Sequence, residues 1–171
     1  LVRFTSNAAA ALKTNGSVVT WGDSGSGGDS SSVSASLSSG VTQIISADAG
    51  AFAALKGDGS VVTWGNATNG GNSSAVSTAL SSGVTAVSAG YFAFAALKSD
   101  GSVVTWGDSS WGGNSSSVSA ELSSDVVKVY SSGYGFAALK SDGSVVRWGF
   151  GMNNCIDDAA ELALSSGVVK I

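Results

Sequence analysis

The chain contains no histidine and no proline, and Cys155 is its single cysteine. Without histidine it lacks the commonest metal ligand and general base, and one cysteine cannot form a disulfide within the chain. Asp157 and Asp158 are the only adjacent carboxylates, and no activating base stands beside the thiol. We therefore predict that the protein is not an enzyme and that it holds no metal or cofactor.

Charge is also scarce, since only 12% of the residues are charged, about half the usual share. Eight basic and twelve acidic residues give a formal charge of −4, which excludes the basic footprint that nucleic-acid binding requires. No apolar run approaches the roughly 18 residues of a membrane span. Nucleic acid and membrane insertion are therefore not expected.

What the sequence has instead is an internal repeat. The tripeptide Ala-Leu-Lys occurs four times, and a tryptophan follows eight residues after each lysine, at successive spacings of 43, 42 and 42. These tryptophans are Trp21, Trp64, Trp106 and Trp148. We predict one repeat domain over residues 1–171, with four units at approximately 2–44, 45–86, 87–128 and 129–170.

Each unit carries the pattern of a β-hairpin. A turn pair that tolerates positive φ separates the Ala-Leu-Lys segment from a β-branched run that ends in tryptophan. The turn pairs are Asn15-Gly16, Asp58-Gly59, Asp100-Gly101 and Asp142-Gly143. Another strand-like segment precedes each later hairpin, at Val41–Ala47, Val84–Ala89 and Val126–Ser131. Each unit should form three antiparallel strands, and one extra residue between Gly40 and Lys56 predicts a bulge or a longer turn.

A loop of constant length follows each tryptophan. Nineteen positions separate the tryptophan from the residue that opens the next unit, which is Gly40, Gly83, Asp125 or Gly167. Within three loops an apolar pair lies at i and i+4: Val33 and Leu37, Val76 and Leu80, Val118 and Leu122. This spacing predicts either a short helical turn with both residues on one face or an extended arm with two anchors.

A three-stranded unit cannot bury both of its faces alone, so neighbouring units must cover it. The alanine-rich strand allows close approach, and the four repeat tryptophans are expected to fill the wedge between units. A closed ring and an open superhelical or solenoid array both satisfy this. Val2 and Ile171 occupy the same repeat position, so we expect the terminal strands to pair with adjacent repeats or with another copy.

The motif Ala-Leu-Lys-x-Asp-Gly-Ser-Val-Val-x-Trp-Gly, with Gly-Gly six and seven residues beyond the tryptophan, resembles the regulator of chromosome condensation repeat. It is similar to the short bacterial-type version, which is also found in a propeller-shaped β-lactamase inhibitor. The resemblance covers nearly the whole chain and implies an all-β fold in which each unit is one blade of a β-propeller. Phe52, Phe94 and Phe136 stand where family members often have histidine. The nucleotide-exchange activity of one branch is not transferred, because its elements have no match here.

Two sets of aspartate and asparagine residues are candidate sites. Asp23, Asn66 and Asp108 follow the tryptophans and are predicted to cap turns, in preference to forming a cation site. Sequons predict glycosylation at Asn15, Asn66, Asn72 and Asn114 if the protein is secreted.

Two breaks in the repeat predict partner contacts. Trp111 stands where the other loops carry Ser26, Asn69 and Asn153, so the shared core does not require it. An exposed tryptophan is a plausible anchor for a protein or a glycan, while packing against its own loop is the alternative. The fourth loop replaces the Gly-Gly and serine pattern with Phe150, Met152 and Ile156, which indicates an end cover, a subunit contact or a local repacking.

Together these features favour an extracellular or cell-surface repeat scaffold with a structural or adhesive role. Such a scaffold would self-associate or belong to a longer array, because unmatched terminal strands offer edges for strand pairing. Leu1 in place of Met predicts a processed protein or an excerpt of a longer one. The alternative function is a soluble protein-binding β-propeller that uses its loops as a recognition face.

Overall fold

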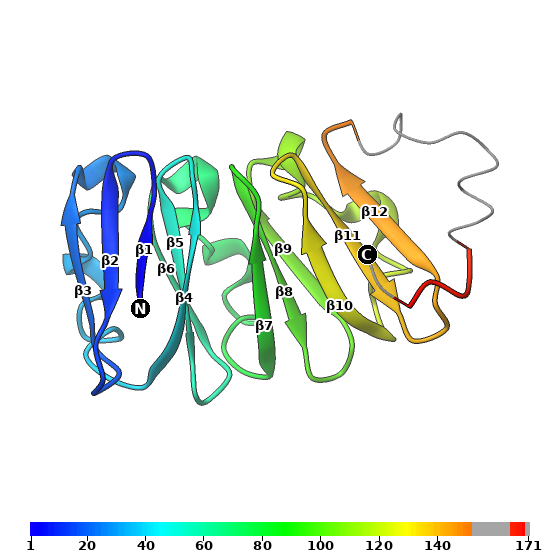
Figure 1. The fold of residues 1–171 in the computed structure, drawn as a ribbon, viewed down its shortest axis with the longest axis horizontal. Coiled ribbons are helices and arrows are strands. Elements are labelled where there is room, and N and C mark those ends of the chain that lie inside the picture. Colours follow the sequence, from blue (N-terminus) through cyan, green and yellow to red (C-terminus); the bar gives the residue numbers. More distant parts are fainter. Residues whose placement is uncertain (152–164, 170–171) are drawn as a thin grey trace.

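The computed structural model describes residues 1–151 and 165–169 and is all-β in this part of the chain (Figure 1). Four three-stranded antiparallel sheets stand side by side in one row. The strands are β1 Val2–Phe4, β2 Ala8–Leu12 and β3 Val18–Gly22; β4 Val41–Ala47, β5 Ala51–Lys56 and β6 Val61–Gly65; β7 Val84–Ala89, β8 Ala93–Lys98 and β9 Val103–Gly107; β10 Val126–Ser131, β11 Gly135–Lys140 and β12 Val145–Gly149. The predicted fold of three-stranded blades is confirmed, and the described sheets form an open array in place of a ring.

The alanine-rich strand is central in every sheet, and the tryptophan strand lies at one edge. The predicted unit boundaries at 45, 87 and 129 pass through β4, β7 and β10, so they cut a continuous repeat within its first strand. Val168 N donates to Gly143 O at 2.9 Å, just as Val126 N donates to Gly101 O at 3.0 Å one period earlier. Val168 therefore repeats the start of a first strand, while Ile171 lies outside the described residues.

The hairpin turns form as the turn pairs predict. In the second sheet Asp58 Oδ1 accepts hydrogen bonds from the backbone N of Ser60 at 2.9 Å and from its Oγ at 2.6 Å. Gly59 follows with a φ of +79°, and a Cβ on it would lie 2.8 Å from Gly83 N. Gly59 O also accepts from Val84 N at 2.9 Å. Each turn therefore reverses the chain and also accepts a hydrogen bond from the start of the next repeat.

The extra residue of the second unit lies in the turn between β4 and β5. Ser46 pairs with Phe52, whereas in the third sheet Ala89 pairs with Phe94, so the second turn holds one residue more. A register shift near the start of the first strand recurs in the second, third and fourth sheets. That bulge belongs to the repeat, and the longer turn is the correct one of the two predicted explanations.

The loop after each tryptophan strand contains short helical segments. These are η1 Ser24–Ser26, η2 Ser31–Val33, η3 Ala67–Gly71, η4 Ser74–Val76, η5 Ser109–Trp111 and η6 Ser116–Val118. Leu37 N donates to Val33 O at 3.1 Å, and the other two apolar pairs make the same bond. Leu37 is buried and its carbonyl accepts from Val18 N at 2.9 Å. The helical turn is confirmed, and the extended arm is not observed in these three loops.

The hydrophobic core lies between sheets. Between the first two sheets, Ala8 and Ala10 of β2 face Phe52 and Ala54 of β5, and Leu37 closes the cluster. Two further clusters fill the second and third junctions in the same way. Each sheet therefore depends on its neighbours for burial, as the repeat argument predicts.

Candidate functional site

Three of the four repeat tryptophans lie at the junctions between sheets. Trp64, Trp106 and Trp148 are 3–4% exposed, and each stacks on the phenylalanine that it faces in its own sheet. For Trp64 the ring centroids of the tryptophan and Phe52 are 5.2 Å apart with planes 15° apart. Its Nε1 donates to Gly27 O of the preceding loop at 3.0 Å. The equivalent bonds run from Trp106 to Gly70 O and from Trp148 to Gly112 O.

The first glycine of each Gly-Gly pair is required by this contact. Gly27 has a φ of +92°, and a Cβ there would lie 2.6 Å from Phe52 Cδ2. Gly70 stands in the same relation to Phe94 at 2.6 Å, and Gly112 to Phe136 at 2.7 Å. At each junction, a loop glycine therefore packs against a phenyl ring, and the backbone carbonyl of that glycine accepts the indole N–H.

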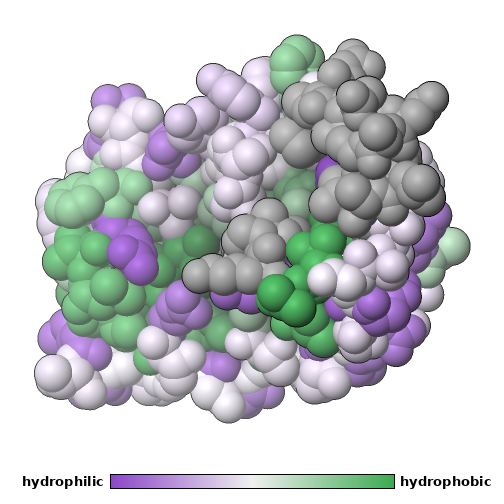
Figure 2. Space-filling view, turned by 45° about the vertical axis from the view of Figure 1, so that its right-hand side comes forward, coloured by the Kyte–Doolittle hydropathy of each residue, from purple (hydrophilic) through white to green (hydrophobic). Residues whose placement is uncertain are grey.

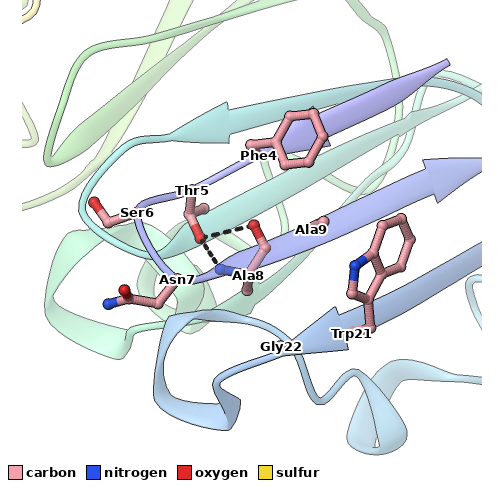
Figure 3. Close-up of a pocket in the computed structure, with 8 residues that line it drawn as sticks. All are labelled: Phe4, Thr5, Ser6, Asn7, Ala8, Ala9, Trp21 and Gly22. Carbon is pink, nitrogen blue, oxygen red and sulfur yellow. Dashed lines mark hydrogen bonds between the residues drawn. The ribbon is translucent and has the colours of Figure 1, made fainter.

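Trp21 holds the same strand position but lies on the outer face of the first sheet. It is 48% exposed, and its cross-strand partner is Ala9, where the later sheets have phenylalanine. Figure 3 shows the rings of Phe4 and Trp21 on either side of Ala9. These residues line a cleft of about 230 Å³. Three of the four predicted tryptophans therefore lie between sheets. For Trp21 the inter-unit role stays a prediction, because no described sheet lies against that face.

A cluster of five aromatic side chains, here called the aromatic rim, forms around Trp111. Its ring centroid lies 4.7 Å from that of Phe150, 4.9 Å from Phe92 and 5.2 Å from Tyr134. Tyr91 completes the cluster, 5.3 Å from Tyr134. Tyr91, Tyr134 and Phe150 are 40%, 49% and 58% exposed, whereas Trp111 is half-buried among the others. Trp111 is therefore the centre of an exposed aromatic surface.

Backbone hydrogen bonds hold the rim in place. Tyr91 N donates to Gly133 O at 2.8 Å, which joins the turn between β7 and β8 to the turn between β10 and β11. Phe150 N donates to Tyr134 O at 2.9 Å. In the first two repeats, Asn7 O and Gly50 O accept the equivalent hydrogen bond, and neither residue is aromatic. Only the third and fourth repeats therefore build an aromatic rim.

The structure brings together two of the four predicted partner contacts, Trp111 and Phe150. Met152 and Ile156 lie outside the described residues. Sequence reasoning missed Tyr91, Phe92 and Tyr134. A signal was present, because the first two repeats carry small or polar residues in the same turns and these aromatic residues therefore depart from the repeat.

The sequon asparagines lie in turns on the surface. Asn15, Asn72 and Asn114 are exposed, and Asn66 is half-buried. Each Oδ1 accepts from the backbone N–H two residues later, at 2.9–3.1 Å. Glycosylation at these positions stays a prediction.

The turn-capping prediction holds for two of its three residues. Asn66 Oδ1 and Asp108 Oδ1 accept from backbone N–H groups, the latter from Ser110 at 2.8 Å. For Asp23 it is wrong, since its side chain makes no capping hydrogen bond and the turn closes through backbone bonds to Asp23 O and Ser24 O. Within residues 1–151 and 165–169 no three histidine, cysteine, aspartate or glutamate side chains come together as a metal site would require. No helix in the same ranges is long and apolar enough to cross a membrane.

Residues 84–117 match the family model of the regulator of chromosome condensation (RCC1) repeat. The match spans the strands of the third sheet and most of the loop that follows. It confirms the resemblance drawn from the tryptophan motif. A comparison with curated protein sequences finds no match.

The fold is similar to that of several solved structures. Prp20p from Saccharomyces cerevisiae, whose study concerns its binding to Gsp1p and histones, has a TM-score of 0.58 at 18% identity; 87% of this chain and 44% of that chain are covered. Human WBSCR16 has a TM-score of 0.57 at 18% identity, with coverage of 91% and 48%. The ectodomain of the Arabidopsis thaliana receptor kinase ACR4 has a TM-score of 0.54 at 17% identity, with coverage of 87% and 49%. This chain spans less than half the length of each.

Proposed function

Because its repeats are of the RCC1 type, we propose that the chain is a non-enzymatic scaffold that binds other proteins, with the aromatic rim as its recognition surface. One observation carries the proposal: five aromatic rings from two neighbouring repeats meet at one rim, and three of them are 40–58% exposed. Tryptophan and tyrosine dominate the binding energy of protein interfaces, and contiguous exposed apolar surface is uncommon on proteins that bind nothing.

Two further facts support a protein partner over nucleic acid. The formal charge of −4 gives phosphate groups no basic surface to bind. A structural neighbour of the same fold, Prp20p, binds Gsp1p and histones, so the fold is suited to holding other proteins. Because the exposed surface of the rim is aromatic, we expect its partner to bind it through aromatic and apolar side chains.

The experiment is affinity capture with the pure chain, followed by direct measurement of each captured protein. Trp111→Asn is the test variant, because Asn69 occupies the same loop position in the second repeat. Val127→Thr is the control, since Val127 is 53% exposed on β10 but lies at the other end of that strand from the rim. We expect partners that bind the wild type and the control but lose at least about thirtyfold in affinity for Trp111→Asn. Equal binding by all three proteins would contradict the proposal.

The second candidate function is a self-associating structural or adhesive role outside the cell. The observation that favours it is the apolar outer face of the first sheet, where Phe4 is 63% and Trp21 48% exposed. The four surface sequons support an extracellular location. Protein purified from its source should lose mass on treatment with an N-glycosidase, and an unchanged mass would remove that support.

A further inference from the structure

We propose that Asn15 is a site of spontaneous covalent modification, at which the side-chain amide becomes a carboxylate through a cyclic imide formed with Gly16. Asparagine is among the thermolabile residues of proteins, and a following glycine leaves the attacking backbone nitrogen unshielded. The sequence has Asn before Gly at Asn15-Gly16 and at Asn69-Gly70, and the structure gives the two pairs opposite environments. The site lies outside the aromatic rim, so this inference does not depend on the proposed function.

Asn15 lies in the first hairpin turn and is exposed. Asp58, Asp100 and Asp142 hold the same position in the other hairpins, and all three are exposed as well. The hairpin turns line the lower edge of the row in Figure 1, and Figure 2 shows mostly polar and weakly polar surface along that edge. Exposure therefore belongs to the turn position itself, so water and hydroxide reach the Asn15-Gly16 pair.

Two hydrogen-bond donors polarise the side-chain carbonyl of Asn15. Its Oδ1 accepts from Ser17 N at 3.1 Å and from Ser17 Oγ at 2.8 Å. When Gly16 N attacks Cγ, negative charge develops on Oδ1, and donors already aimed at that oxygen stabilise the charge. Asn15 Nδ2, which must leave, donates no hydrogen bond within residues 1–151 and 165–169. The turn therefore favours both bond formation at Cγ and loss of the amide nitrogen.

The reaction consumes only water and releases ammonia. Hydroxide removes the proton of Gly16 N when its 3.1 Å hydrogen bond to Lys13 O opens. The nitrogen then bonds to Asn15 Cγ in a five-membered ring, the Cγ–Nδ2 bond breaks, and Nδ2 takes a proton from water and leaves as ammonia. Water opens the ring at Cγ to give aspartate, or at the backbone carbonyl carbon of Asn15 to give isoaspartate.

The pair Asn69-Gly70 has the same chemistry but is held in a junction. Asn69 is half-buried, and its Nδ2 donates to Ala49 O at 2.7 Å, which restrains the leaving group. Gly70 is buried with a φ of +103°, and its carbonyl accepts from Trp106 Nε1 at 3.0 Å. Movement of Gly70 N toward the Asn69 side chain would break these contacts. Asn69 should therefore react far more slowly than Asn15.

The two products of the reaction have different effects on the repeat. Aspartate is the residue of the other three hairpins, where for example Asp58 Oδ1 accepts the same two bonds from Ser60. Isoaspartate instead lengthens the main chain immediately before Gly16, whose carbonyl accepts from Val41 N at 3.0 Å. Aspartate should preserve the turn, whereas isoaspartate should loosen its contact with the second repeat.

The test is to incubate the purified full chain in mildly alkaline buffer and to follow each asparagine by peptide mapping. Mass spectrometry with electron-based fragmentation distinguishes asparagine, aspartate and isoaspartate. In the folded chain Asn15 should convert at least about tenfold faster than Asn69. In concentrated urea the two should convert at similar rates, because the surroundings that distinguish them are lost.

Serine variants test the role of the two donors. Ser17→Ala removes the hydroxyl donor to Asn15 Oδ1 and should slow conversion at least about threefold. Ser17→Thr keeps a hydroxyl and should convert like wild type. Ser60→Ala makes the matched change in the second hairpin and should leave the rate at Asn15 unchanged, with circular dichroism to verify that each variant is folded.

Two results would overturn the inference. One is a folded chain in which Asn15 converts no faster than Asn69. The other is Ser17→Ala that converts as fast as wild type or faster, because the serine bonds would then restrain the turn without activating the amide. Slower conversion in Ser17→Ala, with normal rates in Ser17→Thr and Ser60→Ala, would support it.

Discussion

The junctions and the aromatic rim use the same kinds of residue in opposite ways. Phe94 and Trp106 at a junction are buried and stacked at 5.2 Å, whereas Phe150 and Trp111 at the rim are stacked at 4.7 Å with Phe150 58% exposed. Junction residues recur with the repeat, and rim residues depart from it. Residues that follow the period therefore build the fold, whereas residues that break the period in exposed turns are available for binding.

Removal of one phenyl ring from each region tests this division between junction and rim. Phe94→Ala should lower the free energy of unfolding by about 3–5 kcal/mol, because it opens a cavity against Trp106 and the Gly70 loop. Phe150→Ala should cost less than about 1 kcal/mol, since its side chain is already largely in solvent. Urea denaturation followed by circular dichroism measures both. Equal losses would mean that the rim is structural.

A second test concerns the loop backbone. Gly70→Ala should lower the free energy of unfolding by about 2–4 kcal/mol, because φ is +103° and the new Cβ would lie 2.6 Å from Phe94 Cδ2. Gly25→Ala is the matched control, since its Cβ would meet only Asp23 Oδ1 at 3.4 Å. The control should stay within about 0.5 kcal/mol of wild type. If Gly70→Ala is as stable as Gly25→Ala, the loop does not press on the ring.

A third test isolates the indole hydrogen bond. Trp106→Phe removes the bond from Nε1 to the buried Gly70 O and should cost about 1–3 kcal/mol, part of it from the smaller ring. Trp111→Phe keeps an aromatic ring at the rim, where the indole nitrogen has no hydrogen bond among the described residues, so it should cost less than about 0.5 kcal/mol. Thermal unfolding of the two variants checks the difference, and a reversed order would contradict the division between junction and rim.

The same division explains how much could be predicted. The hairpins, the helical turn at Leu37 and the junction tryptophans followed from residues that recur at a fixed period, because each repeat solves the same packing problem. Asp23 failed as a cap because a side-chain oxygen bond depends on local rotamers that residue type alone does not determine. Of the five rim residues, the sequence analysis predicted only Trp111 and Phe150 as contacts. Tyr91 and Tyr134 are 43 residues apart in sequence and meet through a backbone bond between turns, which the repeat period alone does not reveal.

The hairpin turns belong to neither region, and their carboxylates test whether charge contributes to the stability of the repeat. Hydrogen bonds from the hydroxyl and the backbone N–H of Ser102 hold the pKa of Asp100 below its usual value of 3.8, and Asp58 and Asp142 are held in the same way by Ser60 and Ser144. A lowered pKa stabilises the folded state above the unfolded pKa, and that contribution is lost as the pH falls through the folded value.

These three carboxylates are fully exposed, so the contribution is small. The first hairpin supplies the control, because Asn15 Oδ1 accepts the same two bonds from Ser17 at 3.1 and 2.8 Å without a charge. A triple variant with asparagine at positions 58, 100 and 142 should match the thermal midpoint of wild type at pH 7. Below pH 3.8 it should lose less stability than wild type. If the thermal midpoints of the two proteins fall in parallel down to pH 2, ionisation of the turn carboxylates contributes nothing to stability. The neutral hydrogen bonds that Asn15 accepts would then be an adequate model for all four hairpins.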